Sequence, residues 1–251
     1  YQDLKKLRKK TNNSRLKNIK LNFKKTDFKN LSLKNIYYKY PNTKKGIIQD
    51  ASINFKAKEC VGIVGESGSG KTTIIDILLG LLTPHKGQIL LNGKKINQHS
   101  NPWVKLISYL PQEPLILEDT IKANICLDSM NNRLKNSNKK LNTAIIQANI
   151  KQFIKTLPNG IYTKIGESGV RLSGGQNKRV AIARTFFHDK EILVMDEATS
   201  SLDVNTENLI LEQIKSLKRK KTIIIITHSK NTLKYCDKIY EIKTGRIKKI
   251  K

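Results

Sequence analysis

Long apolar runs, acidic side chains and cysteines are all scarce in this sequence. No apolar run approaches the roughly 18–20 residues of a membrane-spanning helix, which excludes a spanning segment within the printed residues. Residues 1–25 are basic and lack the apolar core of a signal peptide. The three cysteines, Cys60, Cys126 and Cys236, are far apart and form no C-x-x-C pair, which excludes a disulfide framework. A reducing, cytosolic compartment is the simplest fit.

The shortage of acidic residues leaves the chain strongly basic. Lys and Arg number 48 against 20 Asp and Glu, so the formal net charge is +28 over 251 residues. Such a charge suggests nucleic acid or an anionic membrane surface as a partner. The lysines are spread rather than clustered, and Asn and Ile are also abundant, as AT-rich coding would produce. This compositional explanation is favoured, and we expect no specific nucleic-acid partner.

The N-terminal segment, residues 1–30, is the exception, because it is rich in Lys and Asn with isolated apolar residues. We interpret it as a basic linker or loosely docked arm. The alternatives are a disordered tail and a juxtamembrane arm that faces anionic lipid. The first residue is Tyr1 rather than Met, so we expect the chain to be a piece of a longer polypeptide.

The stretch Gly65–Thr72 reads GESGSGKT and fits the phosphate-binding loop pattern G-x-x-x-x-G-K-[ST]. It joins a predicted strand, Cys60–Val64, to a predicted helix, Thr73–Leu82, which disfavours a chance glycine-rich turn. The glycines let backbone N–H groups point at one anion, and the helix adds its positive N-terminal end. We expect Lys71 to reach the β- and γ-phosphates and Thr72 to bind Mg²⁺. The predicted nucleotide-binding residues here are Gly65, Glu66, Ser67, Gly68, Ser69, Gly70, Lys71, Thr72 and Thr73.

Other segments predict an α/β fold with a mainly parallel core sheet, an antiparallel β layer and a helical insert after Gln112. The predicted strands are Leu31–Tyr40, Ile47–Phe55, the hairpin Ile89–Leu91 and Lys94–Ile96 around Asn92-Gly93, Leu106–Leu110, Ile192–Met195 and Thr222–Ile226. Helical spacing is found in Thr120–Leu127, Leu141–Leu157, Ser173–Phe187 and the segment that Asp203 caps, through Leu217. The polar stretch Ser129–Lys140 is predicted to be a surface loop.

A second constellation is Ile192–Glu197, ILVMDE, an apolar strand that ends in two carboxylates. Asp196 is positioned to hold Mg²⁺ through water, and Glu197 to orient or deprotonate an attacking water. The alternative is an ordinary helix cap after a strand.

The third constellation is Leu172–Gln176, LSGGQ. The Ser173 hydroxyl and the amides of Gly174 and Gly175, at a helix start, form a second anion-binding surface together with Gln176. With LSGGQ between the phosphate loop and the Asp-Glu strand, the chain resembles the nucleotide-binding domain of an ABC (ATP-binding cassette) ATPase. The resemblance covers roughly residues 31–250 and implies that LSGGQ serves a nucleotide held by a partner copy.

The resemblance also implies roles for four further residues. Tyr40 stands where such domains place the aromatic ring that stacks on adenine, although Tyr37 and Tyr38 are close to it in sequence. Gln112 resembles the glutamine that touches Mg²⁺ and the attacking water. Asp203 resembles the aspartate that crosses the dimer interface, and His228 resembles the switch histidine at the γ-phosphate. The implied catalytic residues are Lys71, Gln112, Glu197 and His228, and the implied metal-binding residues are Thr72, Gln112 and Asp196.

The segment Thr163–Gly169, TKIGESG, is similar to a segment of ABC exporters in which Glu167 contacts the transmembrane domains. GESGVRLSGGQ also resembles bacterial flippases of lipid-linked oligosaccharides. The resemblance thus implies a P-loop NTPase of the ABC type over residues 31–251, with a helical subdomain at about 113–185. Residues 1–30 would link it to transmembrane domains of the same polypeptide.

The implied function is ATP hydrolysis, with Mg²⁺, by a head-to-tail homodimer at the cytoplasmic face of the inner membrane. It would power export or flipping of a substrate. Two alternatives stay open: a stand-alone importer subunit, which the TKIGESG segment disfavours, and a soluble nucleic-acid-associated ABC ATPase. The second is disfavoured because only about a hundred residues, without sustained heptads, separate the phosphate loop from LSGGQ.

Overall fold

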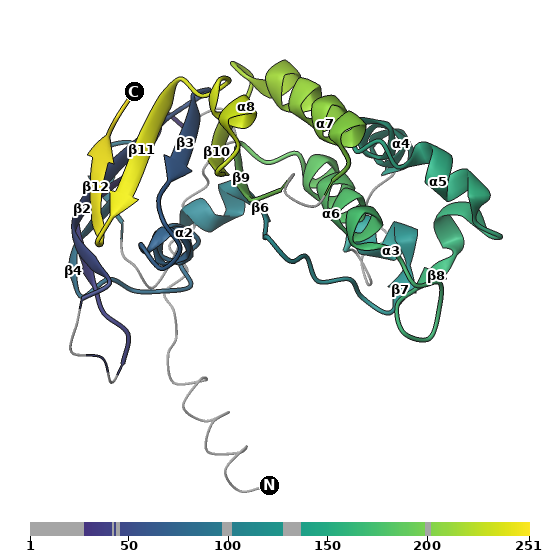
Figure 1. The fold of residues 1–251 in the computed structure, drawn as a ribbon, viewed down its shortest axis with the longest axis horizontal. Helices are drawn as coiled ribbons and strands as arrows, with labels where there is room; N and C mark the ends of the chain where they lie inside the picture. Colours follow the sequence, from purple (N-terminus) through teal and green to yellow (C-terminus); the bar gives the residue numbers. More distant parts are fainter. Residues whose placement is uncertain (1–27, 42, 44–45, 97–101, 128–136, 199–201) are drawn as a thin grey trace, which may run out of the picture.

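The computed structural model describes residues 28–41, 43, 46–96, 102–127, 137–198 and 202–251. In Figure 1 an antiparallel sheet lies at one end, a mainly parallel sheet lies in the middle, and a group of helices lies at the other end. The predicted arm over residues 1–30 falls almost wholly outside the described residues. No helix in the described ranges is both long and apolar enough to cross a membrane.

The antiparallel sheet has the strand order β2-β1-β4-β5. Its strands are β1 Asn30–Tyr38, β2 Ile48–Lys56, β4 Lys86–Leu91 and β5 Lys94–Lys95. Leu31, Leu33 and Ile36 of β1 are fully buried. Leu31 and Leu33 share one face of the sheet because alternate strand residues face opposite sides, and a register shift between Leu33 and Ile36 accounts for the three-residue spacing there. The two predicted strands and the predicted Asn92-Gly93 hairpin are confirmed.

The central sheet has the order β12-β11-β3-β10-β9-β6. Its strands are β3 Cys60–Val64, β6 Ile107–Leu110, β9 Ile192–Asp196, β10 Thr222–Ile226, β11 Lys238–Lys243 and β12 Arg246–Lys249. All neighbours are parallel except β12, which runs antiparallel to β11. The middle strands are continuous apolar runs because helices or the second sheet cover both of their faces. The expected mainly parallel core is therefore confirmed.

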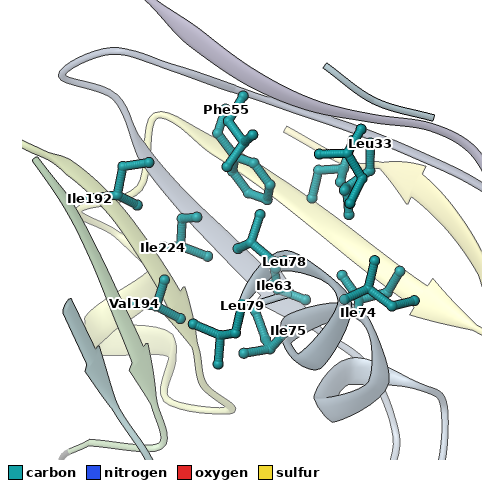
Figure 2. Packing of buried hydrophobic residues seen from close by; sticks show 14 of the residues in the cluster. Leu33, Phe55, Ile63, Ile74, Ile75, Leu78, Leu79, Ile192, Val194 and Ile224 are labelled. Carbon is teal, nitrogen blue, oxygen red and sulfur yellow. The ribbon is translucent and has the colours of Figure 1, made fainter. Parts of the chain in front are cut away.

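Helix α2, Lys71–Leu78, lies between the two sheets. Figure 2 shows Ile74, Ile75 and Leu78 of this helix among residues of both sheets, including Phe55 and Ile63. The helix was predicted to run to Leu82, but Leu79 is its C-cap and Gly80 follows with a φ of 71°. The buried Trp103 indole donates a hydrogen bond to the Leu78 carbonyl at 2.6 Å, which satisfies one of the helix's final carbonyls.

The helices at the far end are α3 Ile121–Cys126, α4 Ser137–Gln147, α5 Lys151–Thr156 and α6 Gly174–His188, and α7 Val204–Leu217 lies beside them (Figure 1). The remaining elements are η2 Pro102–Leu106, β7 Asp119–Thr120, η3 Gly160–Tyr162, β8 Lys164–Ile165 and α8 Lys230–Leu233. Two predictions are wrong in part. Helical structure over Leu141–Leu157 is interrupted because Asn149 adopts a left-handed φ of 51°. The loop predicted at Ser129–Lys140 already becomes helix at Ser137, and residues 129–136 lie outside the described residues.

Candidate active site

The phosphate loop connects the C-terminal end of β3 to the first turn of α2, as the sequence predicts. Gly70 is the N-cap of α2 in the left-handed region, with a φ of 107°, and no side chain caps the helix. The free N–H groups of the first turn therefore face the loop, where the helix dipole favours an anion. The Lys71 amino group lies across the loop and donates hydrogen bonds to the carbonyls of Gly65 at 2.7 Å and Glu66 at 2.9 Å.

A cavity of about 370 Å³ opens beside this loop. Its lining joins the loop to side chains from three other strand ends and from the segment between β1 and β2. The lining residues are Tyr40, Ile47, Ser67, Gly68, Gly70, Lys71, Thr72, Thr73, Gln112, Asp196, Glu197 and His228. Most of the predicted site residues are therefore brought together at one place.

Two polar side chains in this cavity, Gln112 and His228, lie next to the Glu197 carboxylate. The Gln112 side-chain amide donates a hydrogen bond to one of its oxygens at 2.8 Å, and Nε2 of His228 lies 3.7 Å from the other. Glu197 itself has a left-handed φ of 45°, and its backbone N–H donates to the Ile226 carbonyl on β10 at 2.9 Å. A non-glycine residue in this region is strained, and such strain is typical of residues held for function.

Asp196, at the end of β9, is buried with 7% exposure. Burial raises the pKa of its carboxyl, the neighbouring Glu197 charge raises it further, and Lys71 and a hydrogen bond from Tyr109 lower it. Burial and the Asp196 charge in turn raise the pKa of Tyr109 to about 12. Burial and the Glu197 charge therefore disfavour the ionised form of Asp196, and a bound cation would favour it.

The oxygen ligands in the cavity fit Mg²⁺, which prefers carboxylate, hydroxyl and phosphate oxygens. Within the described ranges, no three His, Cys, Asp or Glu side chains are grouped so as to hold a metal ion. Thr72 and Asp196 could hold Mg²⁺ only in part, so the phosphate oxygens of a nucleotide would complete its coordination.

Two residues near the catalytic group were missed by the sequence analysis. Lys178 on α6 is buried and donates a hydrogen bond from its amino group to the Glu197 carbonyl at 2.9 Å. Burial lowers the pKa of this amine, while Glu197 and Asp196 raise it. Tyr109 on β6 bonds Asp196. No local pattern in the sequence distinguishes either residue.

Of the three neighbouring tyrosines, Tyr40 is the one in the described lining of the cavity. Its hydroxyl lies 3.2 Å from the Thr73 hydroxyl, and it lines the cavity, whereas Tyr38 is buried with 7% exposure. Tyr37 is exposed and is not part of the described lining. The His85 ring packs near Tyr38, and the His188 ring packs near Phe187. The fourth histidine, His99, lies outside the described residues.

The remaining predicted residues lie elsewhere. Ser173 caps α6 in a capping box, accepting a hydrogen bond from the Gln176 N–H at 3.3 Å, while the Gln176 side chain accepts one from the Ser173 N–H at 2.9 Å. Asp203 caps α7 and accepts from the Thr206 N–H at 2.9 Å, which lowers the pKa of its carboxyl. The described cavity lining includes none of Ser173–Gln176 or Asp203. Glu66 and Ser69 line a separate hollow behind the phosphate loop.

Comparison of the chain with models of known protein families gives a match. The family model described as ABC transporter matches residues 48–200, which is more than half of the chain. The chain belongs to the ABC transporter family. It carries the ATP-binding domain of that family, and the fold expected from the resemblance is confirmed.

The names of two similar proteins and of one solved structure refer to flipping or export. The chain is 35% identical over 84% of its length to an ATP-dependent lipid A-core flippase of Bordetella avium. It is 42% identical over 84% of its length to a putative export ATP-binding/permease protein of Rickettsia typhi. It spans only 36% of each relative. A bacterial Atm1-family ABC exporter with ATP bound matches its fold with a TM-score of 0.79 at 34% identity, over 88% of this chain and 38% of that one.

Proposed function

We propose that two copies of this chain bind two ATP molecules head to tail and hydrolyse them, and that this cycle powers export or flipping of a substrate across a membrane. The observation that carries the proposal is the single cavity where the phosphate loop meets Gln112, Asp196, Glu197 and His228. Similarity to an exporter with ATP bound and to flippases supports the same function.

Each cavity residue then has a task that its position suits. The free N–H groups of the loop and the Lys71 amine would bind the β- and γ-phosphates, and Tyr40 would stack on the adenine. Glu197, held by Gln112 and near His228, would accept a proton from the attacking water, and the His228 imidazole would bind the γ-phosphate. Thr72, Asp196 and Gln112 would hold Mg²⁺, which would neutralise phosphate charge when bound. Positioning and charge stabilisation would supply most of the rate.

The position of LSGGQ supports the head-to-tail arrangement. Ser173 and Gly174 are exposed at the N-terminus of a 15-residue helix, whose dipole favours an anion. Since the described lining of the chain's own cavity does not include them, they are available to the nucleotide of a second copy, with Asp203 at the same interface.

Coupling to membrane domains is supported by the pairing of two segments. The chain after Gln112 reaches β7, which pairs antiparallel with β8, the start of TKIGESG. Ser168 donates a hydrogen bond to Glu118 at 3.4 Å, and Glu167 is exposed beside it. Movement of Gln112 on nucleotide binding could thus reach the surface around Glu167. We place transmembrane domains of the same polypeptide there, with residues 1–30 as the linker and the chain at the cytoplasmic face.

The test is Glu197→Gln, with ATP hydrolysis and molecular mass measured in solution. The variant should lose nearly all hydrolysis, because the amide cannot accept a proton, yet still bind Mg-ATP and accumulate as a dimer. Lys71→Ala is the control, since it should lose both nucleotide binding and the dimer. A Glu197→Gln variant that stays monomeric in saturating Mg-ATP would contradict the head-to-tail proposal.

A further inference from the structure

Ile47, just before β2, is one of the residues that line the cavity. This residue lines the cavity together with Tyr40, and its backbone N–H donates to the Tyr38 carbonyl at 2.9 Å. Ile47 therefore lines the cavity together with the ring that we assign to the adenine base, and its placement should affect how firmly a base is held.

The turn between β11 and β12 lies in close contact with the backbone of Ile47. Gly245 in this turn has a φ of 77°, and a Cβ at this position would overlap the Ile47 carbonyl oxygen and lie 3.3 Å from Cα of Ile48. The Gly245 carbonyl also accepts a hydrogen bond from the Gln49 N–H at 2.8 Å. The turn is thus bonded to the chain immediately after Ile47, and its contact with Ile47 leaves no room for a side chain.

The phosphate loop also lies in close contact with Ile47 and Ile48. A Cβ at Gly70 would lie 2.7 Å from Cδ1 of Ile48 and 3.5 Å from Cγ2 of Ile47. Behind the loop, a hollow of about 310 Å³ is lined by Ile47, by loop residues Glu66–Ser69 and by Glu241–Gly245. Ile47 and Ile48 are therefore fixed between the loop and the C-terminal hairpin.

We infer that Gly245 is a positioning residue that acts through Ile47 to set the base end of the nucleotide cavity. The inference rests on the proposed function, since it assumes a nucleotide in this cavity. Any side chain at position 245 must displace the Ile47 backbone or break the bond to Gln49. The groups around Glu197 belong to other strand ends, so base binding should suffer while the chemical step does not.

The experiment compares Gly245→Ala with Gly93→Ala in the 251-residue chain. Gly93 is a matched control because it also lies in a tight turn with a φ of 78°, but a Cβ there meets nothing within 4 Å. Gly245→Ala should raise the KM for ATP by roughly tenfold, as expected for one lost apolar contact, with kcat within about twofold. Gly93→Ala should change neither.

Binding of ATP and of inorganic triphosphate separates the base end from the phosphate end. Gly245→Ala should weaken ATP binding and leave triphosphate binding unchanged, and Ile47→Ala, which leaves the turn intact, should show the same split. The double variant should bind ATP no more weakly than the worse single variant, because both act through one side chain.

Several results would overturn the inference. They are equal ATP affinity in Gly245→Ala and Gly93→Ala, equal loss of ATP and triphosphate binding, or a fall in kcat alone. If Gly245→Ala does not fold, an Ile47→Ala variant with normal ATP affinity would also overturn it. Failure of the wild-type chain to bind ATP would instead defeat the proposed function itself.

Discussion

The buried carboxylate of Asp196 lowers the stability of the folded chain when it is ionised. Burial and Glu197 raise the pKa of its carboxyl in the folded chain. A raised folded-state pKa means that the protonated carboxyl is favoured by folding, a contribution present below the unfolded pKa and lost as pH rises through the folded pKa. Above the folded-state pKa the ionised side chain therefore lowers stability, as is common for residues kept for function.

Asp196→Asn should accordingly raise the thermal midpoint of the nucleotide-free chain by a few degrees at pH 7. The gain should shrink as pH falls, because protonation then removes the charge from the wild-type side chain as well. The same variant should lose the further stabilisation that Mg-ATP gives the wild type. Thermal unfolding with and without Mg-ATP measures both effects.

The control is Glu212→Gln, which neutralises an exposed carboxylate on α7 and should leave the midpoint almost unchanged. An Asp196→Asn chain that melts below the wild type at pH 7 would contradict the assigned cost of this buried charge.

Among the elements, helix α3 stabilises the irregular segment that leads from Gln112 to β7. Asn124 of α3 is fully buried, and its side chain accepts a hydrogen bond from the Leu117 N–H at 2.8 Å and donates to the Leu117 carbonyl at 2.9 Å. Arg184 of α6 donates to the Asn124 carbonyl at 2.8 Å and to the Leu115 carbonyl at 3.0 Å. The Asn124 side-chain amide thus makes hydrogen bonds to Leu117 that a neighbouring strand would make in a regular sheet.

Asn124→Ala should lower the free energy of unfolding by about 1–3 kcal/mol, because it removes a fully buried side chain and leaves the Leu117 N–H without its partner. Urea unfolding followed by circular dichroism gives this value. Asn142→Ala, on the exposed face of α4, is the matched control and should change it by less than about 0.5 kcal/mol. A loss in Asn124→Ala no larger than in the control would show that the segment does not depend on this amide.

On the scale of the whole molecule, the two halves of the proposed ATP site face different partners. The cavity holds the phosphate loop and Glu197, while Ser173 and Gly174 are exposed at the start of α6. In a head-to-tail dimer, the cavity of each copy would face the N-terminus of α6 in the other copy. Such a dimer is symmetric and closed. Neither copy alone would then contain a complete site.

Mixing two inactive variants should therefore restore hydrolysis. Lys71→Ala disables the phosphate loop, and Gly174→Glu places a negative charge where a phosphate of the partner's nucleotide would lie. Gly174 has no atom within 4 Å of an added Cβ, and a carboxylate suits a helix N-terminus, so this variant should fold. A one-to-one mixture should recover part of the wild-type activity, since each mixed dimer holds one complete site.

ATP hydrolysis by each variant alone and by the mixture provides the measurement. Mixing Lys71→Ala with a Lys71→Ala, Gly174→Glu double variant is the control, and this mixture should stay inactive. No recovery in the test mixture, with both variants folded, would argue against a site shared between copies.

The sequence by itself determined the features that depend on neighbouring residues. Gly65–Thr72 specifies a phosphate loop because its conformation and its ligands lie within eight consecutive residues. The all-buried strands β9 and β10 follow from unbroken apolar runs, and the start of α7 follows from the Asp203 side chain that caps it. These features gave the fold and the family.

Only the tertiary structure decided which distant groups meet. Gln112 and Glu197 bond across 85 positions of the chain, Lys178 bonds the Glu197 carbonyl from a helix, and Gly245 contacts Ile47 from the far end of the sequence. No local pattern encodes such contacts, because they depend on the order of strands in the sheet. The same is true of the break between α4 and α5, where continuous helical spacing gives way to a left-handed Asn149. The strand order places these groups, and the residues' own chemistry then assigns their proposed tasks.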